Sequence, residues 1–266
     1  PSAAPRAEPG TRRPAVRFLE LLWFSAYAEL KAESARSYLG FLWWLLEPAM
    51  FMAVFWVVFG LVLGNRDPDF IPFLLVGLTF WQWLKSCITH GSHAIWLNIP
   101  LMRQVRLPVL LFPLTAVLSD TVKFAFIFAV LLVILWSLGH PPGWAYLALP
   151  LVFAVELLLG CAGALIAAAV VPFVPDIRFV IENAMMALMF LSGVVFSLAS
   201  LPEPYAAWMA FNPVVGIIES ARDILMRGQW PDWLLLAKAG IGSLVVLAFA
   251  VVLIMRLAPR FPKLAV

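Results

Sequence analysis

The sequence predicts an all-α integral membrane protein, and three observations carry this prediction. Of the 266 residues, 64% are hydrophobic and only 12% are charged, which is about half the charged share of an ordinary soluble domain. The mean hydropathy is +0.97. The apolar residues gather in stretches of about 20 residues or more, the length that a helix needs to cross a hydrocarbon core about 30 Å thick. This composition excludes a cytosolic enzyme, a disordered protein and a secreted disulfide scaffold.

The N-terminal region is predicted to lie outside the membrane core. Residues 1–14 lack apolar periodicity and are expected to form a disordered cytoplasmic tail. Residues 15–34 are expected to form an amphipathic helix in the membrane interface, because their apolar residues recur at three- and four-residue spacing. Packing on another protein domain is the alternative. Charged residues leave no uncharged h-region here, so no cleavable signal peptide is expected. The apolar face consists of Val16, Leu19, Leu22, Trp23, Ala26, Tyr27 and Leu30.

Residues 35–266 are predicted to form a six-span transmembrane domain. The loop at 95–108 is too polar to span but has helical character between two prolines. The region at 201–233 is predicted to hold two short helices that enter the membrane and return, separated near Asn212-Pro213. The six spans are expected at about 44–63, 70–90, 110–138, 144–171, 179–199 and 234–257.

The distribution of basic residues predicts the orientation of the chain. Most of the 18 Lys and Arg residues flank one side of the predicted spans. The positive-inside rule therefore places both termini in the cytoplasm, and an even number of spans agrees with this. The net charge of +3 is attributed to these membrane-edge residues, so no nucleic-acid partner is expected.

The sequence contains no motif of a catalytic or metal site. No Walker A loop is present to hold ATP phosphates, and no G-x-S-x-G or H-E-x-x-H occurs. Cys87 and Cys161 are far apart in sequence and match no disulfide framework or metal-ligand spacing. We therefore expect no enzyme active site, no metal and no cofactor in this chain.

Several charged residues fall inside the predicted spans, and three of them are candidates for a functional charge cluster. Asp120 and Lys123 lie three residues apart on one face of the third span, and Glu156 lies near the middle of the fourth. A charge at that depth is costly, so pairing is expected. One interpretation is a structural bridge from Lys123 to Asp120 or Glu156 that locks two spans together. The other is a proton or ion relay, as in an ion-coupled secondary transporter or channel, although no convincing internal repeat is present.

Four sequence segments resemble one family of membrane proteins. The segment ARSYLGFLWWLLEP at 35–48 resembles the R-x-S-x-L-G-x-L-W-x-x-x-x-P entry to the first span of type-2 ABC exporter permeases. Within them it is similar to the subgroup that exports polysaccharides and polyol phosphates, such as O-antigen, capsule and teichoic acid. The other matches are Asn98-Ile99-Pro100-Leu101-Met102 with Leu107-Pro108, then Pro175-Asp176-Ile177-Arg178, then Asn212-Pro213 followed by Glu219, Arg222 and Gly228. The third match departs from the usual adjacent Arg-Asp order.

This resemblance, over about 16–257, implies a partnership with ATPases. Such permeases pair with a second copy of themselves and with two cytoplasmic nucleotide-binding ATPase subunits, which hold the ATP and Mg. It also implies a location in the bacterial inner membrane and a re-entrant region that includes Asn212, Pro213, Glu219 and Arg222. A coupling helix that contacts the ATPase would include Asn98, Ile99, Pro100, Leu101, Met102, Arg103 and Arg106.

The resemblance further implies a channel for a lipid-linked glycan at the dimer interface. Aromatic and Met side chains offer the weak, adaptable contacts that a sliding polymer needs, although the same residues could face lipid or the dimer seam. A cluster of basic residues could receive the anionic head group of the substrate, or could serve only to set the topology. The candidate channel residues are Phe51, Phe55, Trp56 and Phe59 in the first span and Met185, Met186, Met189 and Phe190 in the fifth; the candidate head-group residues are Arg13, Arg17, Lys31 and Arg36.

The expected function is thus the transmembrane subunit of an ATP-driven exporter of a lipid-linked polysaccharide. The main alternative is an ion-coupled secondary transporter or channel that uses Asp120, Lys123 and Glu156. A small-molecule or lipid ABC exporter is a second alternative, and a non-transporting scaffold is a weaker third.

Overall fold

The computed structural model describes most of the chain beyond the N-terminal tail. The predicted first span at 44–63 lies largely outside the described residues, but the described positions between 42 and 58 are helical. The described residues are 14–36, 42, 46, 49–50, 53–54, 57–58, 69–105, 107–198 and 201–264.

These residues form helices joined by short turns, and no strand occurs among them. Within the described part of the chain, four segments are long and apolar enough to cross a membrane: Phe70–Gln104, Leu111–Ser137, Trp144–Val170 and Trp233–Lys263. The protein is therefore a multi-pass membrane protein. The elements are α1 (Pro14–Arg36), α3 (Phe70–Gln104), α4 (Leu111–Ser137), η2 (Trp144–Ala148), α5 (Leu149–Val170), α6 (Ile177–Phe190), α7 (Glu203–Met209), α8 (Pro213–Leu225), α9 (Trp233–Leu257) and η4 (Ala258–Lys263).

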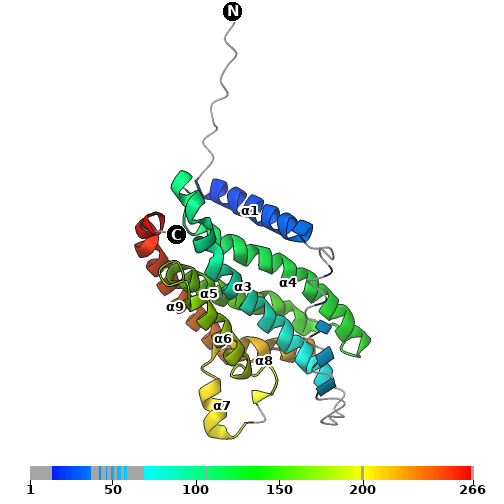
Figure 1. The fold of residues 1–266 in the computed structure, drawn as a ribbon. Helices are drawn as coiled ribbons and strands as arrows, with labels where there is room; N and C mark the ends of the chain where they lie inside the picture. Colours follow the sequence, from blue (N-terminus) through cyan, green and yellow to red (C-terminus); the bar gives the residue numbers. More distant parts are fainter. Residues whose placement is uncertain are drawn as a thin grey trace, which may run out of the picture.

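The long helices form one bundle (Figure 1). α5 packs between α3 and α9, while α4 packs on α3 and α1 packs on α4. One end of the bundle carries α1, the C-terminal end of α3 and η4, and α7 lies at the other end. The helices that surround the candidate site are thus fixed against a common core.

Three predicted spans match the structure closely. The spans expected at 110–138, 144–171 and 234–257 correspond to α4, to η2 with α5, and to α9. α4 stops where Gly139 adopts a φ of +94°, a left-handed conformation that glycine adopts without a steric penalty. α9 begins after Asp232, whose carboxylate accepts hydrogen bonds from the backbone N–H groups of Leu234 and Leu235, as a helix N-cap does.

The helical character predicted for 95–108 is present, but this helix is not separate from the second span. α3 continues from Phe70 to Gln104 without interruption and contains Pro100. A proline removes one backbone hydrogen bond, but Ile95 and Ile99 on the preceding turns are both fully buried. Burying two such side chains stabilises the helix by roughly 3–6 kcal/mol, which offsets the loss. At 1.5 Å per residue α3 is about 52 Å long, so it extends well beyond a hydrocarbon core.

The fifth predicted span, at 179–199, is shorter than expected. α6 covers only Ile177–Phe190, which is about 21 Å at 1.5 Å per residue and too short to cross a hydrocarbon core alone. The chain turns where Gly193 adopts a φ of +66°. The two short helices predicted in 201–233 are present as α7 and α8, and Asn212 caps the second one.

The largest core cluster is aromatic at its centre. Trp83 of α3 stacks on Phe124 of α4 at a centroid distance of 4.0 Å, and Phe128 packs edge-on against Phe153 of α5 at 4.9 Å. Phe80, which is fully buried, contacts three of these rings. This cluster fixes α3 against α4 and α5, and so fixes the polar side chains that α3 and α4 carry within two helical turns of it.

Candidate functional site

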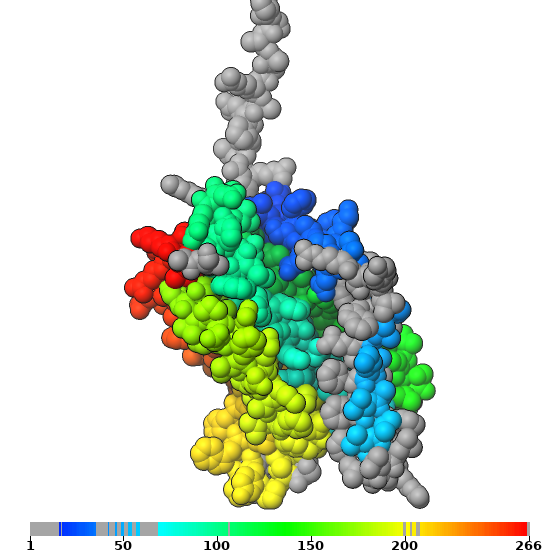
Figure 2. Space-filling model, viewed as in Figure 1, coloured from blue at the N-terminus to red at the C-terminus, as the bar shows by residue number. Residues whose placement is uncertain are grey.

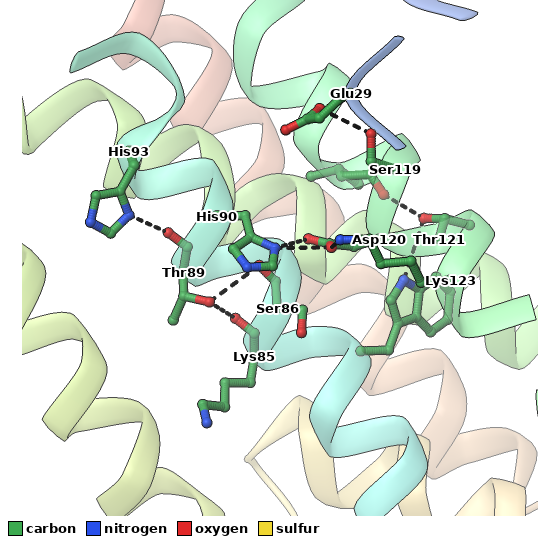
Figure 3. A network of polar contacts seen from close by, with 12 residues as sticks. Glu29, Lys85, Ser86, Thr89, His90, His93, Ser119, Asp120, Thr121 and Lys123 are labelled. Atoms are coloured by element: carbon green, nitrogen blue, oxygen red, sulfur yellow. Dashed lines mark hydrogen bonds and ion pairs between the residues drawn. The ribbon is translucent and has the colours of Figure 1, made fainter. Parts of the chain in front are cut away.

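A cavity of about 540 Å³ lies between α1, α3 and α4. Its polar lining comes from all three helices, with Glu29 and Glu33 from α1, His90 from α3, and Asp120 and Lys123 from α4. Figure 3 shows that His90 points across the cavity toward Asp120. Three acidic groups, one lysine and two histidines, His90 and His93, thus share a site at the end of the bundle that carries α1.

The charged groups of this cavity form a continuous network. His90 donates from Nδ1 to Asp120, at 2.9 Å from Oδ1 and 2.8 Å from Oδ2. Lys123 Nζ lies 3.3 Å from Asp120 Oδ1 and 2.6 Å from Glu33 Oε2. The Asp120 side chain is only 2% exposed, and a carboxylate so deeply buried requires cationic or hydrogen-bonding partners. Lys123 therefore connects the buried Asp120 of α4 to Glu33 of α1.

A second contact joins α1 to α4 beside this network. Ser119 donates its hydroxyl proton to Glu29 at 3.0 Å. The loss of water on the side that faces α4 raises the pKa of Glu29, and the nearby Asp120 charge raises it further, while the Ser119 bond and Lys123 lower it. On balance, the packing of α1 on α4 favours the protonated form of Glu29.

Glu156 does not join the network. It is 2% exposed on α5, and its Oε2 has no hydrogen-bond partner among the described residues. Of the two bridges considered from the sequence, Lys123 makes the one to Asp120 and adds one to Glu33 that the sequence pattern did not predict. The three charged residues expected to act together thus lie at two separate places.

The methionines of the fifth predicted span face two directions. Met186 and Met189 line a second cavity, of about 550 Å³, between α3 and α6. Met185 is 5% exposed and packs in the core, and its place in a channel wall stays a prediction. Phe190 is half exposed. The candidate channel residues of the first span lie outside the described residues: Phe51, Phe55, Trp56 and Phe59.

Little of the predicted head-group cluster is described. Lys31 is exposed on α1, on the helix that also supplies Glu29 and Glu33. Arg13 lies outside the described residues, as do the side chains of Arg17 and Arg36. The grouping of these four residues therefore remains a prediction.

The predicted coupling segment forms the end of α3, and its residues face different surroundings. Ile99 is fully buried and Met102 packs against the second core cluster. Leu101 is 41% exposed, as an apolar residue at the tip of a long helix. Pro100 is exposed, whereas Asn98 is partly buried and donates to the Ala94 carbonyl at 2.8 Å. Arg106 lies outside the described residues.

Arg103 of this segment contacts the C-terminal part of the chain. Its Nε donates to the carbonyl of Pro262 at 3.1 Å, and a second guanidinium nitrogen donates to the carbonyl of Leu264. η4, which follows α9 directly, is thereby attached to the end of α3. A movement of this end of α3 would therefore also move the C-terminal segment.

Arg222 of α8 is the most deeply buried charged side chain of the predicted re-entrant region. Its guanidinium donates to the carbonyls of Gly193 and Val194, each at 2.7 Å, and to Glu219 at 3.3 Å. It also donates to the Phe73 carbonyl at 3.4 Å and lies over the Phe73 ring. Burial lowers the pKa of Arg222 to about 10, although Glu219 opposes this. Arg222 therefore stays charged at neutral pH and ties α8, the turn after α6 and α3 together.

Asn212 and Pro213 start α8 and anchor it to the turn after α6. The Asn212 side chain accepts a hydrogen bond from Val214 N–H at 3.0 Å, as an N-cap does. Its amide nitrogen donates to the Leu191 carbonyl and to Ser192 Oγ. Pro213 occupies the first helical position, where its missing N–H costs nothing. The Asn-Pro pair is thus a structural start signal for α8.

Several residues of these cavities were not predicted from the sequence. The network partners His90 and Glu33 were missed, as were Lys85 and Glu182 in the second cavity. The sequence does contain a signal that could have identified the α3 residues of the second cavity, because polar residues of α3 recur at three- and four-residue spacing along one helical face. They are Gln82, Lys85, Thr89 and His93. No such signal links α1 to α4, since that contact depends on tertiary packing.

No group of three or more His, Cys, Asp or Glu side chains that could hold a metal ion occurs within the described ranges. The polar network consists of ion pairs and hydrogen bonds between helices, at a site open to a cavity. This arrangement suits the transmission of a movement or the passage of a polar molecule.

The chain is similar to a family of membrane transport proteins. Residues 20–226 match the family model described as ABC-2 type transporter. A relative from Myxococcus xanthus, an O-antigen export system permease protein, is 29% identical over 77% of this chain and 79% of its own length. A Klebsiella pneumoniae protein of the same description is 24% identical over 79% of this chain and 81% of its own. A polysialic acid transport protein from Escherichia coli is 26% identical over 82% of this chain and 86% of its own.

Proposed function

Because the chain belongs to the ABC-2 type transporter family, we propose that it is the permease subunit of an ATP-driven exporter of a lipid-linked polysaccharide. The observation that carries this proposal is the family match over residues 20–226, together with relatives that are O-antigen and polysialic acid transport proteins. These relatives match the chain over most of their own length, so the similarity is not confined to one segment. The membrane is the bacterial inner membrane, with both termini in the cytoplasm.

ATP and Mg belong to a partner subunit in this proposal. The chain carries no Walker A sequence, so a separate nucleotide-binding ATPase supplies the energy. The end of α3 is the contact for this partner, since it exposes the apolar side chains of Leu97, Leu101 and Val105. Closure of the ATPase would push on α3, and two permease copies would bind two ATPase subunits.

The same push would reach α1 through the polar network. α3 carries His90, which is bonded to Asp120 of α4, and Asp120 is connected through Lys123 to Glu33 of α1. α1 carries Lys31 and includes the predicted head-group residues Arg17 and Arg36. In the proposal, ATP-driven movement of α3 thus repositions the helix that receives the anionic head of the substrate.

The channel itself would lie between two copies of the chain. The first span and α6 of each copy line it, with Met186, Met189 and Phe190 on the α6 side. Phe190 and Met186 are exposed in the single chain, as expected for residues that face a passage or a second copy.

A deletion experiment in the source bacterium tests this function. Removal of the gene should abolish surface polysaccharide and cause its lipid-linked precursor to accumulate inside the cell. A plasmid copy should restore export only when the ATPase partner is intact. Unchanged surface polysaccharide after deletion, with no second copy of the gene present, would contradict the proposal.

A further inference from the structure

His140 follows α4 at the end of the bundle away from α1 (Figure 1) and contacts two other helices through its two ring nitrogens. Its Nδ1 donates to the carbonyl of Met226, which ends α8, at 3.1 Å. Its Nε2 lies 3.5 Å from the carboxylate of Asp69, the residue before α3. In Figure 2 the yellow surface of α7 marks this end of the molecule, and the blue surface of α1 marks the other. One imidazole therefore joins the ends of three helices.

The two contacts of His140 fit the protonated form of its imidazole. A carbonyl oxygen only accepts hydrogen bonds, so Nδ1 carries a proton in the contact with Met226. Neutral imidazole has one N–H group, which leaves a lone pair on Nε2 facing the carboxylate of Asp69. Protonation of Nε2 replaces this approach of two acceptors by an ion pair. The imidazolium thus satisfies both contacts at once, whereas the neutral ring satisfies only one.

The chain around His140 fixes the position of the ring. The backbone N–H of His140 donates to the Leu135 carbonyl of α4 at 3.0 Å. Gly139 before it has a left-handed φ, and the rings of Pro141 and Pro142 after it fix their own φ angles. The His140 side chain is 13% exposed, so the imidazole keeps a path to water. The ring is therefore held between α3 and α8 while it can still exchange a proton.

The contacts of His140 close a ring of hydrogen bonds between α3 and α8. The Asp69 carbonyl accepts from Phe73 N–H at 2.9 Å, and the Phe73 carbonyl accepts from the Arg222 guanidinium at 3.3 and 3.4 Å. The Arg222 carbonyl in turn accepts from Met226 N–H at 2.9 Å. We call these five residues the His140 clasp. Because Arg222 also holds the turn after α6, the clasp connects His140 to α6 as well as to α8.

The other charged groups described at this end of the bundle have partners of their own. Arg227 pairs with Asp223 and lies 3.6 Å from Glu219. Asp232 caps α9. The part of α4 after Lys123 and the whole of η2 contain no charged residue. Among the described residues, Asp69 is therefore the charged group that faces the imidazole.

We propose that the His140 clasp is a pH-sensitive restraint on the external end of the exporter. The inference rests on the proposed export function and on the expected orientation, which puts this end outside the cytoplasm. Imidazole changes its charge between about pH 5 and pH 8. The closed clasp holds the additional proton, so it is favoured at low pH and weakens as the pH rises through this range. At low external pH the clasp fixes α8 and the turn after α6, and export slows.

A distance measurement across the clasp in purified protein tests the pH dependence. Leu138→Cys and Gln229→Cys carry spin labels in a chain with Cys87→Ala and Cys161→Ala. Leu138 lies in the turn after α4, and the backbone of Gln229 is hydrogen-bonded to α8. The chain is purified with its accompanying subunits, placed in nanodiscs without glycan, and measured by double electron–electron resonance at about pH 5.5 and about pH 8.

Three variants of the labelled chain assign the response. His140→Gln and Asp69→Asn each remove one charged member of the clasp. His93→Gln is the matched control, since it makes the same replacement at a histidine outside the clasp. The Asp69 side chain is 64% exposed, so Asp69→Asn decides the question even where His140→Gln does not fold.

The expected result is a narrow distance distribution at about pH 5.5 and a several-fold smaller clasped fraction at about pH 8. His93→Gln should keep this response, whereas His140→Gln and Asp69→Asn should give the same distribution at both pH values. An unchanged distribution in the parent chain would overturn the proposal. A response of parental size in either clasp variant, or its loss in His93→Gln, would overturn it as well.

Export from cells tests the consequence for transport and separates the clasp from the export function. The parent strain should show several-fold less surface polysaccharide at an external pH of about 5.5 than at about 8, and His140→Gln should abolish this difference. Equal export by the parent and by His140→Gln at both pH values would reject the regulation and leave the export function standing. A pH-dependent distance in a chain whose deletion leaves surface polysaccharide unchanged would reject the export function and leave the clasp.

Discussion

His90 donates from Nδ1 to both carboxylate oxygens of Asp120, at 2.9 and 2.8 Å, although the two residues lie on different helices and 30 positions apart. Lys123 forms an ion pair with Asp120 and a second ion pair with Glu33 of α1. The position of α1 thus depends on a carboxylate buried between α3 and α4. Two of the predictions below, for Asp120 and Arg222, follow from contacts of this kind, in which one buried group fixes several helices.

Replacement of Asp120 should destabilise the bundle more than replacement of an exposed charge. Asp120→Ala leaves Lys123 and His90 without their shared partner, and loss of one member of a buried ion pair costs about 3–5 kcal/mol. Thermal unfolding in detergent measures the effect. The control is Lys238→Met, which removes an exposed charge. Equal melting temperatures for the two variants would show that the network does not hold the helices together.

Arg222 should be essential for the packing of α8. Arg222→Leu leaves the carbonyls of Gly193 and Val194 without this donor and removes one of the partners of Glu219, and we expect a loss of roughly 3 kcal/mol or more. Arg227→Leu, on the same helical segment but with a 44% exposed side chain, should cost about 0–1 kcal/mol. Denaturant or thermal melts compare the two. Similar losses would contradict the role assigned to Arg222.

Gly91 should not tolerate a side chain. A Cβ atom there would lie 2.5 Å from Ala164 Cβ and 2.9 Å from its Cα, so α3 and α5 would have to separate. Overpacking of this kind costs about 1–3 kcal/mol or more. Gly242→Ala on α9, where a Cβ meets nothing within 4 Å, should instead be neutral or stabilising by up to about 1 kcal/mol. Expression yield and melting temperature of the two variants check this difference.

The docking of α1 should weaken as the pH rises. The pKa of Glu29 is raised by lost hydration and by Asp120, so the docked state binds a proton more tightly than the undocked state. The corresponding stabilisation is present below the ordinary pKa of a glutamate and is lost as the pH rises through the raised value. The fluorescence of Trp23, which is exposed on α1, or limited proteolysis of α1, follows the docking. Glu29→Gln should remove this dependence, and an unchanged pH profile in that variant would contradict the assignment.

The exposed leucines at the end of α3 should be needed for the ATPase contact. Leu101→Glu places a charge at the proposed interface and should reduce the recovered ATPase at least about tenfold, which corresponds to about 1.4 kcal/mol. Leu138→Glu is the control. It changes a leucine of similar exposure at the C-terminal end of α4. It should leave recovery unchanged, and an equal loss in both variants would point to misfolding instead of a lost contact.

Long uninterrupted apolar segments made the bounds of α4, α5 and α9 predictable. The helical segment expected within 95–108 is the end of α3 rather than a separate element, because the buried Ile95 and Ile99 keep the helix continuous through Pro100. α6 is shorter than its hydrophobic segment, since Gly193 turns the chain. The burial that keeps α3 continuous is not visible in local sequence. The glycine that ends α6 is visible there, but its left-handed conformation is not.

The candidate site was only partly predictable for the same reason. Asp120 and Lys123 were identified from their depth and spacing, because three-residue spacing fixes a shared helical face. The contact between Lys123 and Glu33 joins positions 90 residues apart on helices that pack only in the folded bundle. Met185 could not be separated from Met186 by composition, yet one lies in the core and the other is exposed.

Purification of the tagged chain from its native membrane in detergent, followed by mass spectrometry of the proteins that accompany it, tests the central claim most directly. The account predicts a separate Walker-containing ATPase in a one-to-one ratio with this chain. A stable, ATPase-free complex, obtained under conditions where the ATPase is expressed, would contradict an ATP-driven exporter. Attention would then turn to Asp120, Lys123 and Glu156 as the groups of an ion-coupled transporter.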